Sequence, residues 1–67
     1  MLNKNYFSIL LEEIAEINDK MIKLLELAEE SEDSLKATIF MLRRQAYAKE
    51  RKRLVSNLNE YVNMLNK

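Results

Sequence analysis

Apolar side chains recur every three or four residues through the first half of this 67-residue chain. Seven of them follow 3-4-3-4 spacing without a gap: Phe7, Leu10, Ile14, Ile17, Met21, Leu24 and Ala28. This spacing places them along one side of an α-helix. Four further apolar residues widen that side, namely Leu11, Ala15, Ile22 and Leu25. The pattern predicts a helix over residues 5–30 whose apolar side is too wide for one partner helix to cover.

The second half keeps the same periodicity and predicts a second helix over residues 35–66. Its apolar side has a central column of residues seven apart and two flanking columns. The central column is Ala37, Arg44, Arg51, Leu58 and Leu65, and the flanking columns are Phe40, Tyr47, Leu54 and Tyr61, and Met41, Ala48, Val55 and Val62. We expect Ser34, or alternatively Ser31, to cap this helix. Asn57 and Asn59 leave open a break near Ser56, which would create a short third helix.

Charge is segregated between the two halves. Residues 1–34 contain three Lys and nine acidic side chains, whereas residues 35–67 contain eight Lys or Arg and two acidic side chains. The halves therefore carry −6 and +6, which favours an antiparallel hairpin with its turn at residues 31–34. A turn centred between Glu32 and Asp33 places Ile14 opposite Arg51 and Met21 opposite Arg44.

Composition excludes most other architectures. The chain has no Gly and no Pro, so tight turns between strands are disfavoured, and it has no Cys or His to form disulfides or zinc sites. A domain of this size buries little surface and needs another source of stability. We therefore expect a single all-α domain over residues 1–67, an antiparallel two-helix hairpin that dimerises into a four-helix bundle.

Residues 39–42 are apolar on every side of the predicted second helix, so contact with the first helix alone cannot cover them. The first helix carries a matching apolar cluster at the same end of the hairpin. We predict that this end contacts a second copy or a partner through Met21, Leu24, Leu25, Ile39, Phe40, Met41 and Leu42.

Polar residues interrupt the apolar side near the middle of both helices. This predicted polar layer consists of Asn18, Arg44, Tyr47 and Arg51. One interpretation is structural: the layer sets register and oligomeric state, with the Arg stems packed and their charged ends reaching carboxylates or solvent. The other is recognition of an anionic group by the planar guanidinium groups.

The basic second helix also raises a nucleic-acid hypothesis. Its outward side carries Lys49, Lys52 and Arg53, which are candidate phosphate contacts. The basic residues scatter around the helix, however, and the chain has a pI near 6.3. A solvated face paired with acidic side chains is therefore favoured over an RNA or DNA site.

The sequence contains few of the residue types and motifs on which catalysis usually depends. There is no His or Cys to act as nucleophile, base or metal ligand, and no Gly-rich loop to bind phosphates. We expect no enzyme activity, no cofactor and no metal site. No apolar run is long enough to span a bilayer or complete a signal peptide, so we expect a cytoplasmic protein with no membrane association.

The favoured function is therefore protein–protein interaction by a homo-oligomer, most simply a dimer, acting as a regulator, inhibitor or assembly factor. The alternative is an RNA- or DNA-binding hairpin dimer that uses the second helix. A further alternative is a subunit that folds only within a larger helical assembly.

Overall fold

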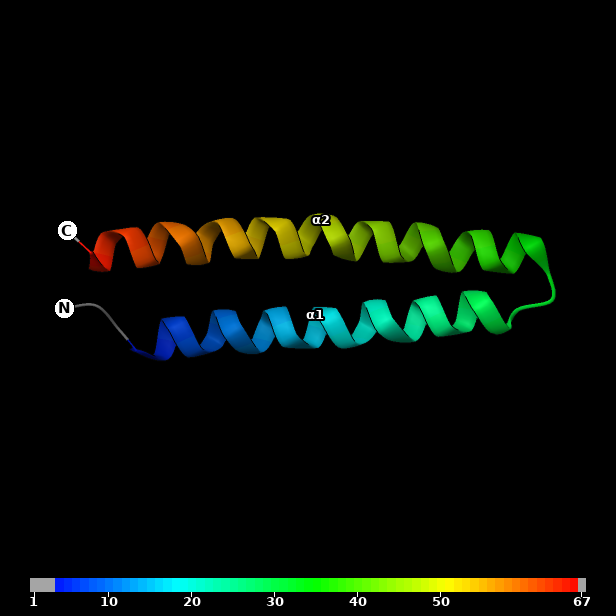
Figure 1. Cartoon of the computed structure of the whole chain (residues 1–67), viewed down its shortest axis with the longest axis horizontal. Coiled ribbons are helices and arrows are strands. Elements are labelled where there is room, and N and C mark those ends of the chain that lie inside the picture. The colour runs from blue at the N-terminus through cyan, green and yellow to red at the C-terminus, as the bar shows by residue number, and fades with distance from the viewer. Residues whose placement is uncertain (1–3, 67) are drawn as a thin grey trace.

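The computed structural model describes residues 4–66, which form two long helices. Helix α1 spans Lys4–Glu30 and helix α2 spans Ser34–Leu65. The helices lie side by side and antiparallel, so the start of α1 and the end of α2 are at the same end of the molecule (Figure 1). The Cα atoms extend over 52 × 15 × 11 Å. The predicted all-α hairpin is confirmed for the described residues.

The turn between the helices is capped by Asp33, and the prediction of Ser34 was wrong by one residue. Asp33 has extended backbone angles, its Oδ1 accepts a hydrogen bond from the backbone N–H of Leu35 at 2.9 Å, and its carbonyl accepts from Ala37 at 3.0 Å. Ser34 is the first helical residue instead. The Ser31 hydroxyl donates to the Asp33 carbonyl at 3.1 Å and holds the turn. Asp caps as well as Ser and adds a negative charge at the positive end of the helix.

Helix α2 runs through Ser56 without a break, so the alternative with a third helix is not realised. Leu54 and Tyr61 are buried on either side of that position, and Leu58 packs against the core. Packing on both sides of a helical segment stabilises it more than the weak propensity of two Asn residues destabilises it.

The buried core is small. Among the described residues, four hydrophobic side chains are buried: Leu10, Ile17, Leu54 and Tyr61. Ile14, Met21, Tyr47 and Leu58 pack around this core and are partly buried. At the open end, the Tyr61 ring lies against Tyr6 and Phe7, with ring centroids 5.2 and 6.2 Å apart.

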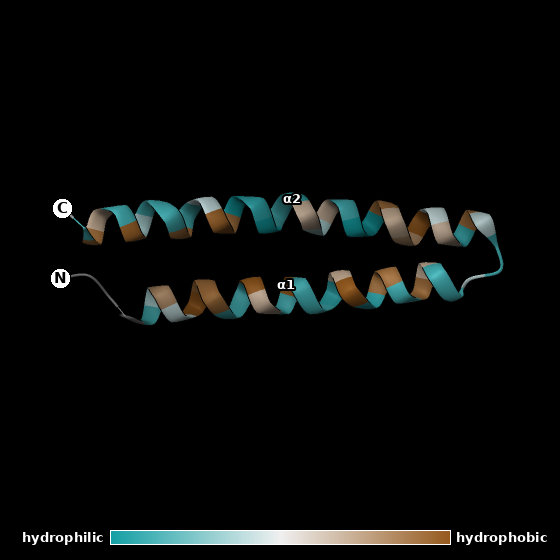
Figure 2. Ribbon diagram, in the orientation of Figure 1, coloured by the Kyte–Doolittle hydropathy of each residue, from teal (hydrophilic) through white to brown (hydrophobic). Residues whose placement is uncertain are grey.

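The side of α2 that packs against α1, which we call the seam, is rotated from its predicted position. Its centre is the column of Tyr47, Leu54 and Tyr61, whereas the predicted centre contained Arg44 and Arg51. Aromatic and leucine side chains gain more from burial than arginines, whose charged ends must stay hydrated or paired. Along its length, α2 is largely hydrophilic around its middle and more hydrophobic towards both ends (Figure 2).

Candidate functional site

The hairpin has two long faces of different chemistry. Asn18 and Arg51 are hydrogen-bonded across the helices on one face, and Lys20 and Tyr47 are in contact towards the other. Residues seven apart on each helix continue these two faces. Because the faces differ, each is a candidate for a different contact.

We call the first of these the apolar face. It consists of Ser8, Leu11, Ala15, Asn18, Ile22, Leu25 and Glu29 of α1, and Ala37, Met41, Arg44, Ala48, Arg51, Val55, Leu58, Val62 and Leu65 of α2. Only three of these sixteen residues are charged. Leu11 and Ile22 remain 44% and 56% exposed, although their neighbours along the chain form the hairpin seam. Such a face in a single hairpin leaves apolar surface in water.

The polar layer lies in the middle of the apolar face. Arg51 Nε donates a hydrogen bond to Asn18 Oδ1 at 2.7 Å, although the Arg51 side chain is exposed. Arg51 therefore contacts α1 at Asn18 and not at Ile14, its predicted neighbour. Asn18 is one helical turn nearer to the loop that joins the helices. Side chains lean towards the N-terminus of their own helix. The Arg51 side chain therefore leans towards the loop between the helices and the Asn18 side chain leans away from it, so the two meet although their backbones are not level.

Arg44 is half buried, and its Nε is buried without a hydrogen-bond partner in the hairpin. Tyr47 belongs to the seam and packs against the core instead of lining the layer with Arg44. The structure thus joins Asn18 and Arg51, leaves Arg44 Nε unsatisfied, and places Tyr47 towards the other face. A buried donor without a partner is unfavourable, which makes Arg44 the least satisfied group of the layer.

The residues predicted to contact a second copy divide into two groups. Those that are half buried within their own hairpin are Met21, Leu24, Leu25, Phe40 and Met41. Ile39 and Leu42 are 40% and 58% exposed and lie on α2 outside the apolar face. The contact with a second copy at this end stays a prediction.

We call the opposite side the charged face. It consists of Tyr6, Ile9, Glu13, Glu16, Lys20, Lys23, Leu27 and Glu30 of α1, and Lys36, Ile39, Arg43, Ala46, Glu50, Arg53, Asn57, Glu60 and Met64 of α2. Ten of these residues are charged. Charged side chains keep most of their hydration only when exposed, so this face is suited to solvent or to a polar partner.

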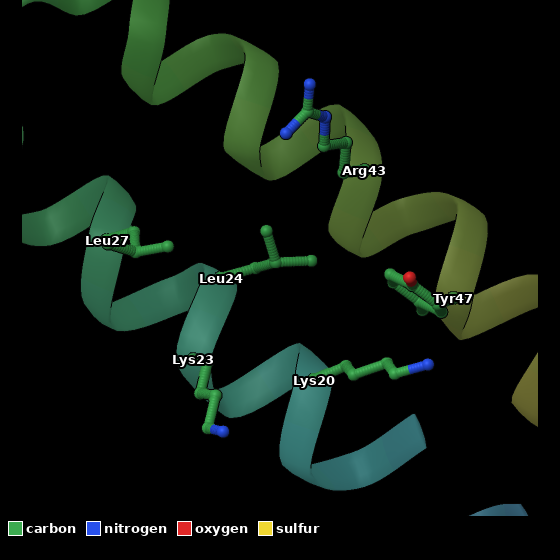
Figure 3. Close-up of a pocket in the computed structure, with 6 residues that line it drawn as sticks. All are labelled: Lys20, Lys23, Leu24, Leu27, Arg43 and Tyr47. Atoms are coloured by element: carbon green, nitrogen blue, oxygen red, sulfur yellow. The ribbon is translucent and has the colours of Figure 1, made fainter. Parts of the chain in front are cut away.

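A shallow groove of about 280 Å³ lies between the helices on the charged face. It is lined by Lys20, Lys23, Leu24, Leu27, Arg43 and Tyr47, as Figure 3 shows. Lys20 Nζ lies 5.4 Å from the centroid of the Tyr47 ring, a cation–π contact. The lining contains three cations and no acid, so the groove favours a group that is both anionic and apolar. Sequence reasoning missed it because Lys20 and Lys23 belong to the acidic half and Arg43 to the other helix.

The basic residues proposed for phosphate contact do not form a free cluster. Lys49, Lys52 and Arg53 are all exposed. Arg53 forms an ion pair with Glu50 one turn away, with Nε donating to Oε2 at 3.2 Å. This hydrogen bond lowers the pKa of the Glu50 carboxyl and raises the pKa of the Arg53 guanidinium. One of the three candidate phosphate contacts therefore already has an anionic partner.

Neither metal nor membrane chemistry is indicated in the part of the chain that the structure describes. There, no group of three or more acidic side chains is arranged to hold a metal ion. Neither α1 nor α2 combines the length and apolarity that a membrane-spanning helix requires.

No protein-family model, curated protein or solved structure matches this chain.

Proposed function

We propose that this chain is a non-enzymatic helical hairpin that pairs with a second copy through its apolar face and acts by binding another protein. Two hairpins joined in this way form a four-helix bundle. The roles that suit such a module are those of a small regulator, an inhibitor or an assembly factor.

The observation that carries the proposal is the mismatch between the small core and the wide apolar face. Four described side chains are buried, whereas residues such as Ile22 and Leu11 remain about half exposed on the apolar face. Small domains without disulfides or metals commonly gain stability by self-association. A second copy covers this face with side chains of the same kind.

The charged face then remains available to the partner protein. Its groove is lined by both cationic side chains, such as Lys23 and Arg43, and the apolar side chains of Leu24 and Leu27. In the described structure, none of the three lining cations forms an ion pair, since the ion pair found there joins Arg53 and Glu50. A helix with acidic and apolar side chains on one side matches this lining.

Self-association should be coupled to folding. We expect a mass of twice the 8.0 kDa chain at micromolar concentration and a melting temperature that rises with protein concentration. Light scattering measures the mass, and circular dichroism measures the melting temperature. A folded monomer whose melting temperature is independent of concentration would contradict the proposal, and an unfolded chain would favour the larger-assembly alternative.

Two isoleucines of α1 provide a matched control for the same experiment. Ile22 on the apolar face is 56% exposed, and Ile9 on the charged face is 50% exposed. In the dimer, Ile22→Lys places a charge in the interface and should reduce the mass towards that of one chain. Ile9→Lys should leave the mass unchanged, because lysine remains solvated on the charged face.

Nucleic acid is not expected to be the principal partner. Arg53 is paired with Glu50, which leaves Lys49 and Lys52 as the two exposed cations of the predicted set without an ion pair in the described structure. The affinity for mixed RNA and duplex DNA at about 150 mM salt should be no better than the non-specific range of ~10⁻⁴–10⁻⁶ M. A titration with labelled oligonucleotides measures it. Submicromolar binding that is abolished by Lys49→Ala, Lys52→Ala and Arg53→Ala together would instead support the nucleic-acid alternative.

A further inference from the structure

The charges of the two helices determine how two copies can meet, given the proposed pairing through the apolar face. Over Lys4–Glu30, α1 carries three basic and seven acidic side chains, whereas α2, over Ser34–Leu65, carries seven basic and two acidic side chains. The acidic helix and the basic helix therefore form opposite edges of each apolar face. Any second copy must place its own acidic and basic edges on this face.

The size of the face is sufficient for a stable dimer. Two of the dimensions of the hairpin, 52 and 15 Å, describe the long face. Such a rectangle covers roughly 800 Å², which is the area that each partner contributes to a standard protein–protein interface. A second copy is thus an occupant of the right length, width and chemistry.

Two copies that meet through this face can do so in two symmetric ways. In the opposite-end arrangement, the turn of one copy lies at the open end of the other, and α1 packs on α1 while α2 packs on α2. In the same-end arrangement, both turns lie at one end, and α1 of each copy packs on α2 of the other. Both arrangements cover the same apolar side chains, so charge distinguishes them.

The opposite-end arrangement brings like charges together. In it α2 packs along α2, so two helices that each carry seven basic and two acidic side chains lie side by side. The α1 helices meet along an edge that repeats an acid every seven residues, at Glu12, Asp19 and Glu26. Like charges in contact across an interface are unfavourable.

The same-end arrangement brings opposite charges together and gives Arg44 a partner. The Arg51–Asn18 bond sets the register, so Arg44, seven residues nearer the turn, is level with Leu25 of α1. Glu29 is one helical turn beyond Leu25 on the same apolar face. Arg44 leans towards the turn and Glu29 leans away from it, because side chains point towards the N-terminus of their helix.

We infer that the dimer has the same-end arrangement, with each α1 between the two α2 helices and Arg44 of each copy facing Glu29 of the other. This pairing supplies an anion next to the guanidinium whose Nε has no partner in the single hairpin. Charge complementarity then selects the topology, while the apolar residues provide most of the buried surface.

Cysteine cross-linking distinguishes the two arrangements, because the chain has no Cys of its own. Glu32 in the turn and Asn66 after α2 are both exposed, and the hydrogen bonds that cap α2 at its start do not involve the Glu32 side chain. The variants Glu32→Cys and Asn66→Cys are refolded separately and as a mixture. A bismaleimide then links nearby thiols. Its reach is chosen close to the about 14 Å between the diagonal α2 helices of a bundle whose packed helices are about 10 Å apart. Mass spectrometry identifies the products.

The same-end arrangement predicts two cross-linked products, one that joins two Glu32→Cys chains and one that joins two Asn66→Cys chains. The yield of each should be at least tenfold above that of a sample in denaturant. The yield of the mixed product, which joins one chain of each variant, should not exceed that background. The two positions in a mixed dimer would lie at opposite ends of a 52 Å molecule. A mixed product as the main species would overturn the inference. A dimeric mass without any cross-link would also overturn it, while leaving self-association intact. A monomeric mass would instead contradict the proposed function itself.

Discussion

Replacement of Leu54 by alanine is expected to lower the free energy of unfolding by about 2–5 kcal/mol. Leu54 is 3% exposed and forms the buried core together with Leu10 and Ile17. Alanine removes three carbon atoms and leaves a cavity between two straight helices that cannot close fully around it. Because single domains are stable by only about 5–15 kcal/mol, this is a large share of the total. Urea denaturation followed by circular dichroism measures the change.

Leu35→Ala is the matched control for Leu54→Ala. Leu35 lies on the same helix and is 67% exposed, outside the apolar face. Its replacement should change the stability by no more than about 0.5 kcal/mol, as is usual for surface positions. Equal effects at Leu35 and Leu54 would show that α2 packs through a different side, and the assignment of the seam would then be wrong.

The double replacement Arg44→Met/Arg51→Met should leave the protein folded and raise its stability by about 1 kcal/mol or more. Methionine keeps the length of the arginine stem and removes the buried Nε of Arg44 together with the cost of burying it. The inferred pair with Glu29 of the other copy is lost as well, but Glu29 is exposed in the hairpin, so this loss costs no more than about 1 kcal/mol. The Arg51–Asn18 bond is lost, but Arg51 is exposed, so water can replace it at small net cost. Thermal melting measures the gain.

The same variant separates the two interpretations of the polar layer. If the layer sets the orientation of the copies, the mass should remain dimeric while turn-to-turn and mixed cross-links both appear. Capture of partner proteins should persist, because the charged face is unchanged. If the layer is a recognition site, the cross-links should stay as in the parent and the partner should be lost. A variant unchanged in stability, cross-links and capture would show that both arginines are ordinary surface residues.

Much of the fold could be predicted from the sequence because it depends on local pattern. The 3-4 spacing predicted α1 over residues 5–30, and the structure has Lys4–Glu30. Charge segregation predicted the antiparallel hairpin. The cap was misplaced by one residue because Ser31, Asp33 and Ser34 all have side chains that cap helices well, and only the backbone geometry selects among them.

The site was predictable only in part. The sequence indicated that Asn18, Arg44 and Arg51 interrupt an apolar side, and the structure joins Asn18 to Arg51 on one face. The groove lined by Lys20 and Arg43 was not predicted, since its residues come from two helices and only the packing of these helices brings them together.

Two helices, their antiparallel pairing and the charges within an apolar side could be inferred without a structure, because helical periodicity and net charge are properties of neighbouring residues. Tertiary packing alone decided which column of α2 is buried. Three adjacent columns are rich in apolar residues, and a rotation of the helix by one column exchanges Arg51 for Leu54 at the seam. The larger apolar area of Tyr47, Leu54 and Tyr61 and the hydration of the arginines make that rotation favourable.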